Sequence, residues 1–214
     1  MHTVQQVDRS VYNVPMTARD TPEISSQSAR ERILRAAHDL FYRDGLRATG
    51  VDRVIAEAGV TKVTFYRHFP SKNELIRVFL EHRHARWLDW FGAALARHRA
   101  AQTPQDRALQ ALAPLQPTLE EWFCQPGFRG CAFINAVAEL GGGLDDALPI
   151  AARHKQDMVD LIGRQLLANH PDRQALAEAA GLAADGAIVR AQTGPEGVRQ
   201  ALAGLQRLLT ALDA

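Results

Sequence analysis

Hydrophobic residues recur every three or four positions along most of the chain, which is the spacing of one face of an α-helix. No stretch shows the alternation of apolar and polar residues that a half-buried strand requires. The pattern therefore predicts an all-α fold. Helices are expected at about residues 28–43, 49–58, 61–69, 71–100, 103–123, 129–140, 149–168, 171–191 and 194–212.

Glycine and hydroxyl residues mark the ends of the N-terminal helices. Gly45 is placed to end the first helix, and Thr49 is placed to open the second with Asp52 as a capping partner. Gly59 supplies a left-handed turn, after which Thr61 caps a third, short helix. Two short helices joined by a tight turn are typical of the helix-turn-helix unit that reads DNA. This helix pair is therefore the first candidate for function.

A long helix connects this pair to the rest of the chain. Ser71 and Glu74 form the S-x-x-E pattern of a capping box, and helical spacing then continues to about residue 100. A helix of this length leaves a small N-terminal bundle and enters a second one. Further on, Pro114 and Pro117 are expected to kink or break the helix that starts at Thr103.

The distribution of charge also separates the N-terminal segment from the rest of the chain. Residues 1–25 carry a net charge of −1, residues 26–72 of +4 and residues 73–214 of −2, although the whole chain carries only +1. Positive charge is thus concentrated on the segment that holds the helix pair, as a phosphate-facing surface requires. We interpret 1–25 as a flexible tail, 26–72 as a helix-turn-helix DNA-binding domain and 73–214 as a separate C-terminal helical domain.

Composition excludes several other classes of protein. The 46% content of hydrophobic residues is ordinary for a globular protein, and no run of about 18 apolar residues indicates a membrane span. The N-terminus lacks the pattern of a secretory signal, and two cysteines do not make a disulfide framework, so we expect a cytoplasmic protein. No nucleophile motif, P-loop or dinucleotide loop is present, and the histidines lack metal-ligand spacing. We expect no enzyme activity, cofactor or metal.

The N-terminal motifs resemble one family in particular. The segment ILRAAHDLFYRDGLRATGVDRVIAEAGVTKVTFYRHFPSKNEL, about a fifth of the chain, is similar to the DNA-binding domain of the TetR (tetracycline repressor) family. Its most specific pieces are Leu40-Phe41…Gly45, Ala58-Gly59-Val60 and the run TFYRHFPSK that begins at Thr64. Val63 departs from the small residue that the family often has there, which bears on base preference and not on the fold. The resemblance implies a helical C-terminal domain that dimerises and binds a small effector.

The residues and the resemblance agree on which side chains face DNA. A major groove admits one α-helix, so the exposed start of the third helix is expected to face base edges, with Lys62 toward guanine acceptors and Val63 toward a thymine methyl. Phosphate contacts fix register rather than read sequence, and we assign them to Tyr66, His68 and Lys72. The predicted DNA-binding residues are Thr49, Thr61, Lys62, Val63, Thr64, Tyr66, Arg67, His68 and Lys72.

The C-terminal domain carries most of the aromatic and sulfur-containing side chains. A mostly apolar pocket with a few polar groups suits a small hydrophobic effector. The segment GFRGCAFINAVAELG resembles a GCxxxNAxxE segment in the ligand domain of family members, which adds Asn135 and Glu139. Glu139 lies in an apolar helix and needs a partner, for which Arg129 and Arg153 are candidates. The predicted effector site comprises Trp87, Phe91, Trp122, Phe123, Cys131, Phe133, Asn135, Glu139 and His154.

Apolar stripes on the last two helices predict a dimer interface. One stripe contains Leu176 and Ala180, the other contains Leu205 and Leu209, and small residues such as Gly186 permit close helix approach. Two such helices from each subunit would form a four-helix interface. The alternative is that both stripes are buried within one subunit.

The expected function is that of a ligand-responsive transcriptional regulator. As a repressor, it would bind a palindromic double-stranded DNA operator as a homodimer and release it when a small, mostly apolar effector binds. One alternative is a DNA-binding regulator without an effector, controlled by another protein or by redox chemistry at Cys124 and Cys131. A helical enzyme that carries the motif would need a set of catalytic groups that the sequence does not show. A scaffold protein would have a fully packed C-terminal domain.

Overall fold

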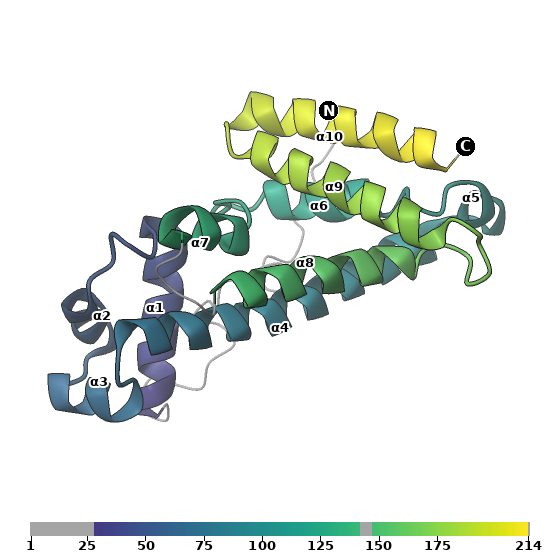
Figure 1. Ribbon diagram of the computed structural model, residues 1–214. Helices are drawn as coiled ribbons and strands as arrows, with labels where there is room; N and C mark the ends of the chain where they lie inside the picture. Colours follow the sequence, from purple (N-terminus) through teal and green to yellow (C-terminus); the bar gives the residue numbers. More distant parts are fainter. Residues whose placement is uncertain (1–27, 142–146, 214) are drawn as a thin grey trace.

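The computed structural model describes residues 28–141 and 147–213, and the predicted tail at 1–25 lies outside the described residues. Every regular element within these ranges is a helix, which confirms the all-α prediction (Figure 1). The elements are α1 (Ala29–Asp44), α2 (Val51–Ala58), α3 (Lys62–His68), α4 (Lys72–Ala101), α5 (Pro104–Leu109), α6 (Leu115–Phe123), α7 (Ala132–Leu140), α8 (Ala147–Gly163), α9 (Arg173–Ala191) and α10 (Pro195–Leu212).

Helices α1, α2 and α3 form an N-terminal head. Ser28 caps α1 by accepting a hydrogen bond from the backbone of Glu31, and Gly45 follows the last turn with a φ of 95°. Gly59, with a φ of 60°, makes the left-handed turn between α2 and α3. A residue with a Cβ would be strained at both glycines. Phe65 is fully buried and anchors α3 to the other two helices.

Several predicted helix ends differ from the structure. Gly50, and not Thr49, is the N-cap of α2. The helix expected at 103–123 is two helices, because Pro114 stands before the first turn of α6 and a proline inside a helix removes a hydrogen bond. Gly130 has a φ of 78°, so α7 begins after it and not at residue 129.

Figure 1 shows α4 leaving the head and continuing along the C-terminal domain, with α8 beside it. Helices α9 and α10 pack against each other, and α8 packs against α9. The 30-residue α4 is about 45 Å long at 1.5 Å per residue, so it passes through both parts of the molecule. No helix in the described ranges is both long enough and apolar enough to cross a membrane.

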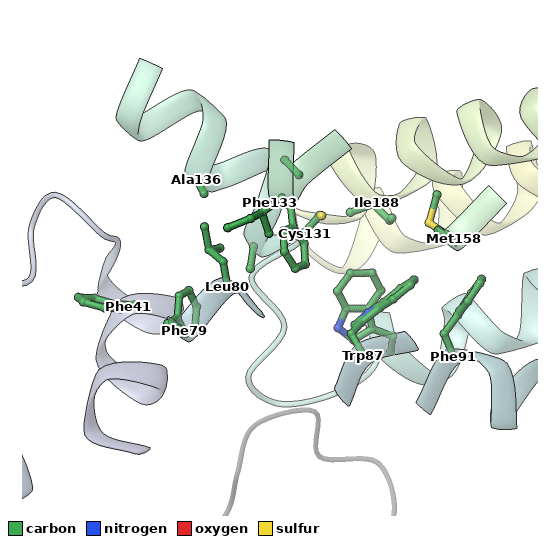
Figure 2. Close-up of a cluster of buried hydrophobic side chains, with 14 of the residues drawn as sticks. Phe41, Phe79, Leu80, Trp87, Phe91, Cys131, Phe133, Ala136, Met158 and Ile188 are labelled. Atoms are coloured by element: carbon green, nitrogen blue, oxygen red, sulfur yellow. The ribbon is translucent and has the colours of Figure 1, made fainter. Parts of the chain in front are cut away.

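The hydrophobic core continues from the head into the C-terminal domain (Figure 2). At the head end, Phe41 of α1 meets Phe79 of α4 edge to face, with 5.5 Å between ring centroids. Farther along α4, Trp87 and Phe91 stack at 4.5 Å, close to Met158 of α8. Because one core spans both parts, a change of packing in the C-terminal domain reaches the head through side chains that are already in contact.

Candidate DNA-binding surface and effector domain

The start of α3 is exposed to solvent. Thr61 caps the helix by accepting a hydrogen bond from the backbone of Thr64 at 3.1 Å, and the two hydroxyls lie 2.9 Å apart. Val63 follows with 70% of its surface exposed, although valine is usually buried. Phe65 and Phe69 are buried on the opposite face. The helix is thus held by one face and presents the other to solvent.

The predicted DNA-binding residues divide into three groups by exposure. The exposed group consists of Thr61, Lys62, Val63, Tyr66 and Arg67. Thr64, His68 and Lys72 are half-buried, and Thr49 is fully buried. The ammonium of Lys62 lies 3.6 Å from the Asp52 carboxylate, and both side chains are exposed. An ion pair this exposed is weak, so Lys62 is free to exchange it for a base or phosphate.

The predicted role of Thr49 as a helix cap is wrong. Its hydroxyl donates to the carbonyl of Gly45 at 2.8 Å and points into the head, where it closes the loop between α1 and α2. The whole residue is consequently buried and is not presented to solvent.

Lys72, at the start of α4, is tied to that same loop. Its ammonium donates to the carbonyl of Arg47 at 3.4 Å, which is a long hydrogen bond. Burial lowers the pKa of Lys72, while the nearby Glu139 carboxylate acts in the opposite direction. A phosphate contact by Lys72 stays a prediction, and it requires this side chain to leave a loose internal partner.

Seven of the nine predicted effector residues are buried in the interior. Phe133 stacks on His154 at 3.7 Å, and Trp87 meets Trp122 edge to face at 5.5 Å. These rings bring α4, α6, α7 and α8 together. The seven buried residues are Trp87, Phe91, Trp122, Phe123, Cys131, Phe133 and His154.

Three predicted effector residues, the buried Phe123 and the half-buried Asn135 and Glu139, line a surface cleft of about 920 Å³. Phe123 comes from α6, and Asn135 and Glu139 come from α7; Tyr42 of α1 and the loop between α9 and α10 complete the walls. The amide of Asn135 donates to the carbonyl of Arg129 at 3.0 Å. The structure therefore places the predicted residues in two neighbouring regions, a packed aromatic cluster and an open cleft.

The predicted partners of Glu139 are wrong. Its carboxylate accepts a hydrogen bond from the backbone of Arg47 at 2.9 Å, in the loop that precedes α2. Arg153 pairs with Glu81 instead. Glu139 is half-buried and joins α7 to the head, so the contact connects the C-terminal helices with the N-terminal head.

Burial keeps the imidazole of His154 neutral within the aromatic cluster. Burial lowers the pKa of His154 to about 2, and the charges of Lys155 and the neighbouring His84 and Arg83 act in the same direction. Cys124 and Cys131 are both free thiols. Burial, with a smaller effect of Glu120, raises the pKa of Cys124, which reduces its thiolate fraction.

The sequence interpretation missed a buried arginine. Arg83 of α4 is 2% exposed, and it contacts His38 and Tyr42 of α1. A signal for it exists in the sequence, since Arg83 falls in the apolar stripe of α4 between Leu80 and Trp87 at helical spacing. A charged residue at such a position needs a structural or functional reason.

The outward faces of α9 and α10 carry exposed apolar side chains. On α9, Leu182 is 75% exposed and Val189 is also exposed; on α10, Leu208 is 53% exposed. Ala180 and Leu205, which we expected in a dimer interface, are buried inside the subunit. The face available to a second subunit is therefore the adjacent stripe on each helix.

Comparison with known proteins places these features in a family. The model for the family described as bacterial regulatory proteins, tetR family, matches residues 33–78. The regulator LmrA of Bacillus subtilis is 38% identical over 55 residues, but the match covers only 26% of this chain and 29% of LmrA. Similarity to this curated relative is thus confined to a segment.

Two solved structures match over nearly the whole chain. The TetR-type protein sav143 of Streptomyces avermitilis is 30% identical, with 87% of this chain and 99% of that chain covered and a TM-score of 0.66. A cysteine variant of CifR, determined with a 26-base-pair operator, is 20% identical, with 89% and 99% covered and a TM-score of 0.68. The second likeness concerns the fold alone.

Proposed function

We propose that this chain, which belongs to the TetR family of bacterial regulatory proteins, is a dimeric repressor that a small effector releases from a palindromic operator. Membership of the family makes it a DNA-binding transcriptional regulator. Repression, the dimer, the effector and the symmetry of the operator are our proposals. Because its target is DNA, we place its action in the cytoplasm.

The observation that carries the proposal is the exposed face of α3. Lys62 and Val63 stand out at the start of a helix whose other face is anchored in the head, which suits insertion into a major groove. Tyr66 and Arg67 are exposed farther along the same helix and would contact the backbone phosphates. Base contacts are thus assigned to the N-terminal end of α3 and phosphate contacts to its C-terminal end.

The dimer is proposed from the exposed apolar residues of α9 and α10. Leu182 and Val189 lie seven residues apart on α9, and therefore on one face, while Leu208 supplies a similar position on α10. Two-fold pairing of these helices would bury the apolar side chains of both subunits. Such a dimer presents two copies of α3, and an operator with two half-sites about 34 Å apart would match it.

Control by an effector is favoured over redox control. Cys124 is exposed, but its raised pKa is the opposite of what a reactive thiol needs. The aromatic cluster and the adjoining cleft instead resemble the mostly apolar, partly polar lining of a small-molecule site. To release DNA, the effector must bind the non-DNA-binding conformation more tightly than the DNA-binding one.

Selection of bound sequences from a random duplex pool tests the DNA-binding part. The wild-type protein should enrich two inverted half-sites at a fixed spacing. An enriched site with a single, asymmetric element would contradict the palindromic operator.

Sedimentation of interface variants tests the dimer. Leu182→Glu with Leu208→Glu should convert the dimer to monomers and weaken operator binding by at least about tenfold, because each half-site would then be bound separately. Leu148→Glu, at an exposed leucine on α8, is the matched control and should remain dimeric. A double variant that sediments like the wild type would place the interface elsewhere.

A further inference from the structure

Arg83 is a buried cation without an anionic partner among the described residues. It is 2% exposed, and no Asp or Glu of the described residues lies within ion-pair distance of its guanidinium. One of its nitrogens, Nη1, is 3.1 Å from Nε2 of His38, whereas Nη2 donates to no described residue. Burial lowers the pKa of Arg83, but arginine does not lose its proton in proteins. A buried charge that is not compensated is strongly unfavourable.

The groups that contact Arg83 are themselves neutral. The guanidinium carbon lies 3.7 Å from the centroid of the Tyr42 ring, and burial raises the pKa of the Tyr42 phenol. Burial also lowers the pKa of His38, so this imidazole accepts from Arg83 as the neutral form. Neither contact supplies a negative charge. The arginine thus has hydrogen-bond and ring contacts but no counterion among the described residues.

The surroundings of Arg83 are rich in donors and in flat rings. The indole nitrogen of Trp87 and Nδ1 of His154 are buried and also lack partners among the described residues. Arg83 is close enough to His154 to affect its pKa, and Trp87 lies 4.9 Å from the same imidazole. Buried donors are normally paired with acceptors, so this region suits a ligand that carries an acceptor. Rings on several sides favour a flat ligand.

The start of α7 adds to this arrangement. The phenol of Tyr42 donates to the carbonyl of Gly130 and accepts from the backbone of Arg129, both just before α7. Cys131 is the N-cap of α7 and provides no side-chain hydrogen bond to its first turn. A helix N-terminus favours negative charge, and here it lies next to a buried cation.

On this basis we propose that the effector is a small carboxylate with a flat, unsaturated or aromatic body, and that its carboxylate binds Arg83. The inference rests on the proposed function and specifies the effector class, which the sequence alone predicted as mostly apolar. The ring body would lie among Trp87 and His154, and the carboxylate would accept from Arg83 Nη2. A planar guanidinium matches the two oxygens of a carboxylate.

The site lies where the head meets the effector domain. His38 and Tyr42 belong to α1, and Arg83 belongs to α4. Both α1 residues also line an open cleft of about 490 Å³, whose other side is formed by the loop between α6 and α7. A ligand entering from this cleft meets the two side chains that cover Arg83. A carboxylate that competes with them for the guanidinium would change the packing of α1 on α4, and therefore the placement of the head.

Tryptophan fluorescence offers a direct measurement of binding. All three tryptophans of the chain, Trp87, Trp90 and Trp122, belong to this cluster. The full-length protein is titrated with benzoate, phenylacetate and butyrate, and with the corresponding amides. We expect saturable fluorescence changes and a raised melting temperature with the aromatic carboxylates, at concentrations at least about tenfold below those needed for their amides.

Two substitutions separate binding from folding. Arg83→Met removes the charge and keeps an unbranched apolar chain. The variant should therefore fold, with a melting temperature equal to or above that of the wild type. It should lose the fluorescence response to benzoate. Arg83→Lys keeps the charge but not the planar fork and should bind benzoate with intermediate affinity. Arg97→Met, at a partly exposed arginine on the same helix, should respond like the wild type.

The results distinguish this inference from the proposed function. Equal responses to the carboxylates and their amides, or an unchanged benzoate response in Arg83→Met, would overturn the carboxylate site. No Arg83-dependent response to any carboxylate of the panel would overturn it as well. Operator binding is measured in the same samples. A neutral compound that releases DNA would support the proposed regulator function and would exclude carboxylates as the effector class. Arg83-dependent carboxylate binding that leaves DNA bound would support the site and contradict effector control by it.

Discussion

Protonation of His154 should couple the stability of the fold to pH. The imidazole is buried against Phe133 and Trp87, and burial is the main reason that its pKa falls from 6.5 to about 2. In the unfolded chain the pKa returns to about 6.5. Below pH 6.5 the unfolded state therefore binds a proton that the folded state does not bind until about pH 2. The stabilisation is fully present above pH 6.5 and is lost progressively as the pH falls through this window.

The size of the effect follows from the two pKa values. Between pH 7 and pH 5, linkage at one such histidine lowers the free energy of unfolding by about 2 kcal/mol, and the slope approaches about 1.4 kcal/mol per pH unit. Urea unfolding at both pH values measures it, at one protein concentration because dimerisation would shift the midpoint. His154→Phe keeps a ring against Phe133 and removes the titration. Between pH 7 and pH 5, the free energy of unfolding of this variant should fall by about 2 kcal/mol less than that of the wild type.

The comparison isolates His154 from the other histidines. Burial also lowers the pKa values of His38 and His82, and both residues remain in the variant. His170→Phe, in the loop between α8 and α9, is the control and should lose as much stability as the wild type. Equal losses in His154→Phe and the wild type would refute the reasoning, because they would mean that the folded protein accepts a proton at His154 near pH 6.

Three further substitutions test the head. Lys62→Ala should relax base preference at one position of each half-site, as measured by binding-site selection, and an unchanged motif would exclude Lys62 from base reading. Lys72→Ala should weaken binding to all sequences and reduce the slope of log affinity against log salt by about one. An unchanged slope would exclude a phosphate contact by Lys72. Thr49→Val removes the hydroxyl bonded to Gly45 and should lower the free energy of unfolding by about 1 kcal/mol in urea, without changing the salt slope. A changed salt slope would indicate that Thr49 contacts DNA.

Local signals in the sequence were sufficient for most helix ends in the head. Ser28 and Thr61 cap their helices through their own hydroxyls, and Gly45 and Gly59 end theirs with positive φ. These are interactions within three or four residues, and a single sequence contains both partners. The prediction for Thr49 failed because its hydroxyl donates to the carbonyl of Gly45 in the preceding turn instead of accepting from the first turn of α2. Burial of the side chain could not be read from residue type.

Contacts between distant segments were not predictable in the same way. The aromatic residues of the C-terminal domain were correctly singled out as a group, but their division into a packed cluster and an open cleft depends on how α6, α7 and α8 meet α4. The partner of Glu139 lies 92 residues away in the sequence, at Arg47. Arg83 and His38 are 45 residues apart. Only the charged residue within an apolar stripe of α4 indicated such a contact, and it did not name the partner.

The structure adds a second connection between the two parts of the molecule, which bears on the proposed effector control. The sequence indicated one connecting helix, α4, yet α7 contacts the head at both of its ends. At its start, the loop that precedes it binds Tyr42 of α1; near its end, Glu139 binds the backbone of Arg47 before α2. A ligand at Arg83 would therefore act next to one of two attachment points rather than at the far end of a single helix. Displacing Tyr42 while the contact of Glu139 with Arg47 holds would tilt α7 against the head. Movement of α7 at one of its two contacts would rotate the head, and such a rotation would change the separation of the two α3 helices in a dimer.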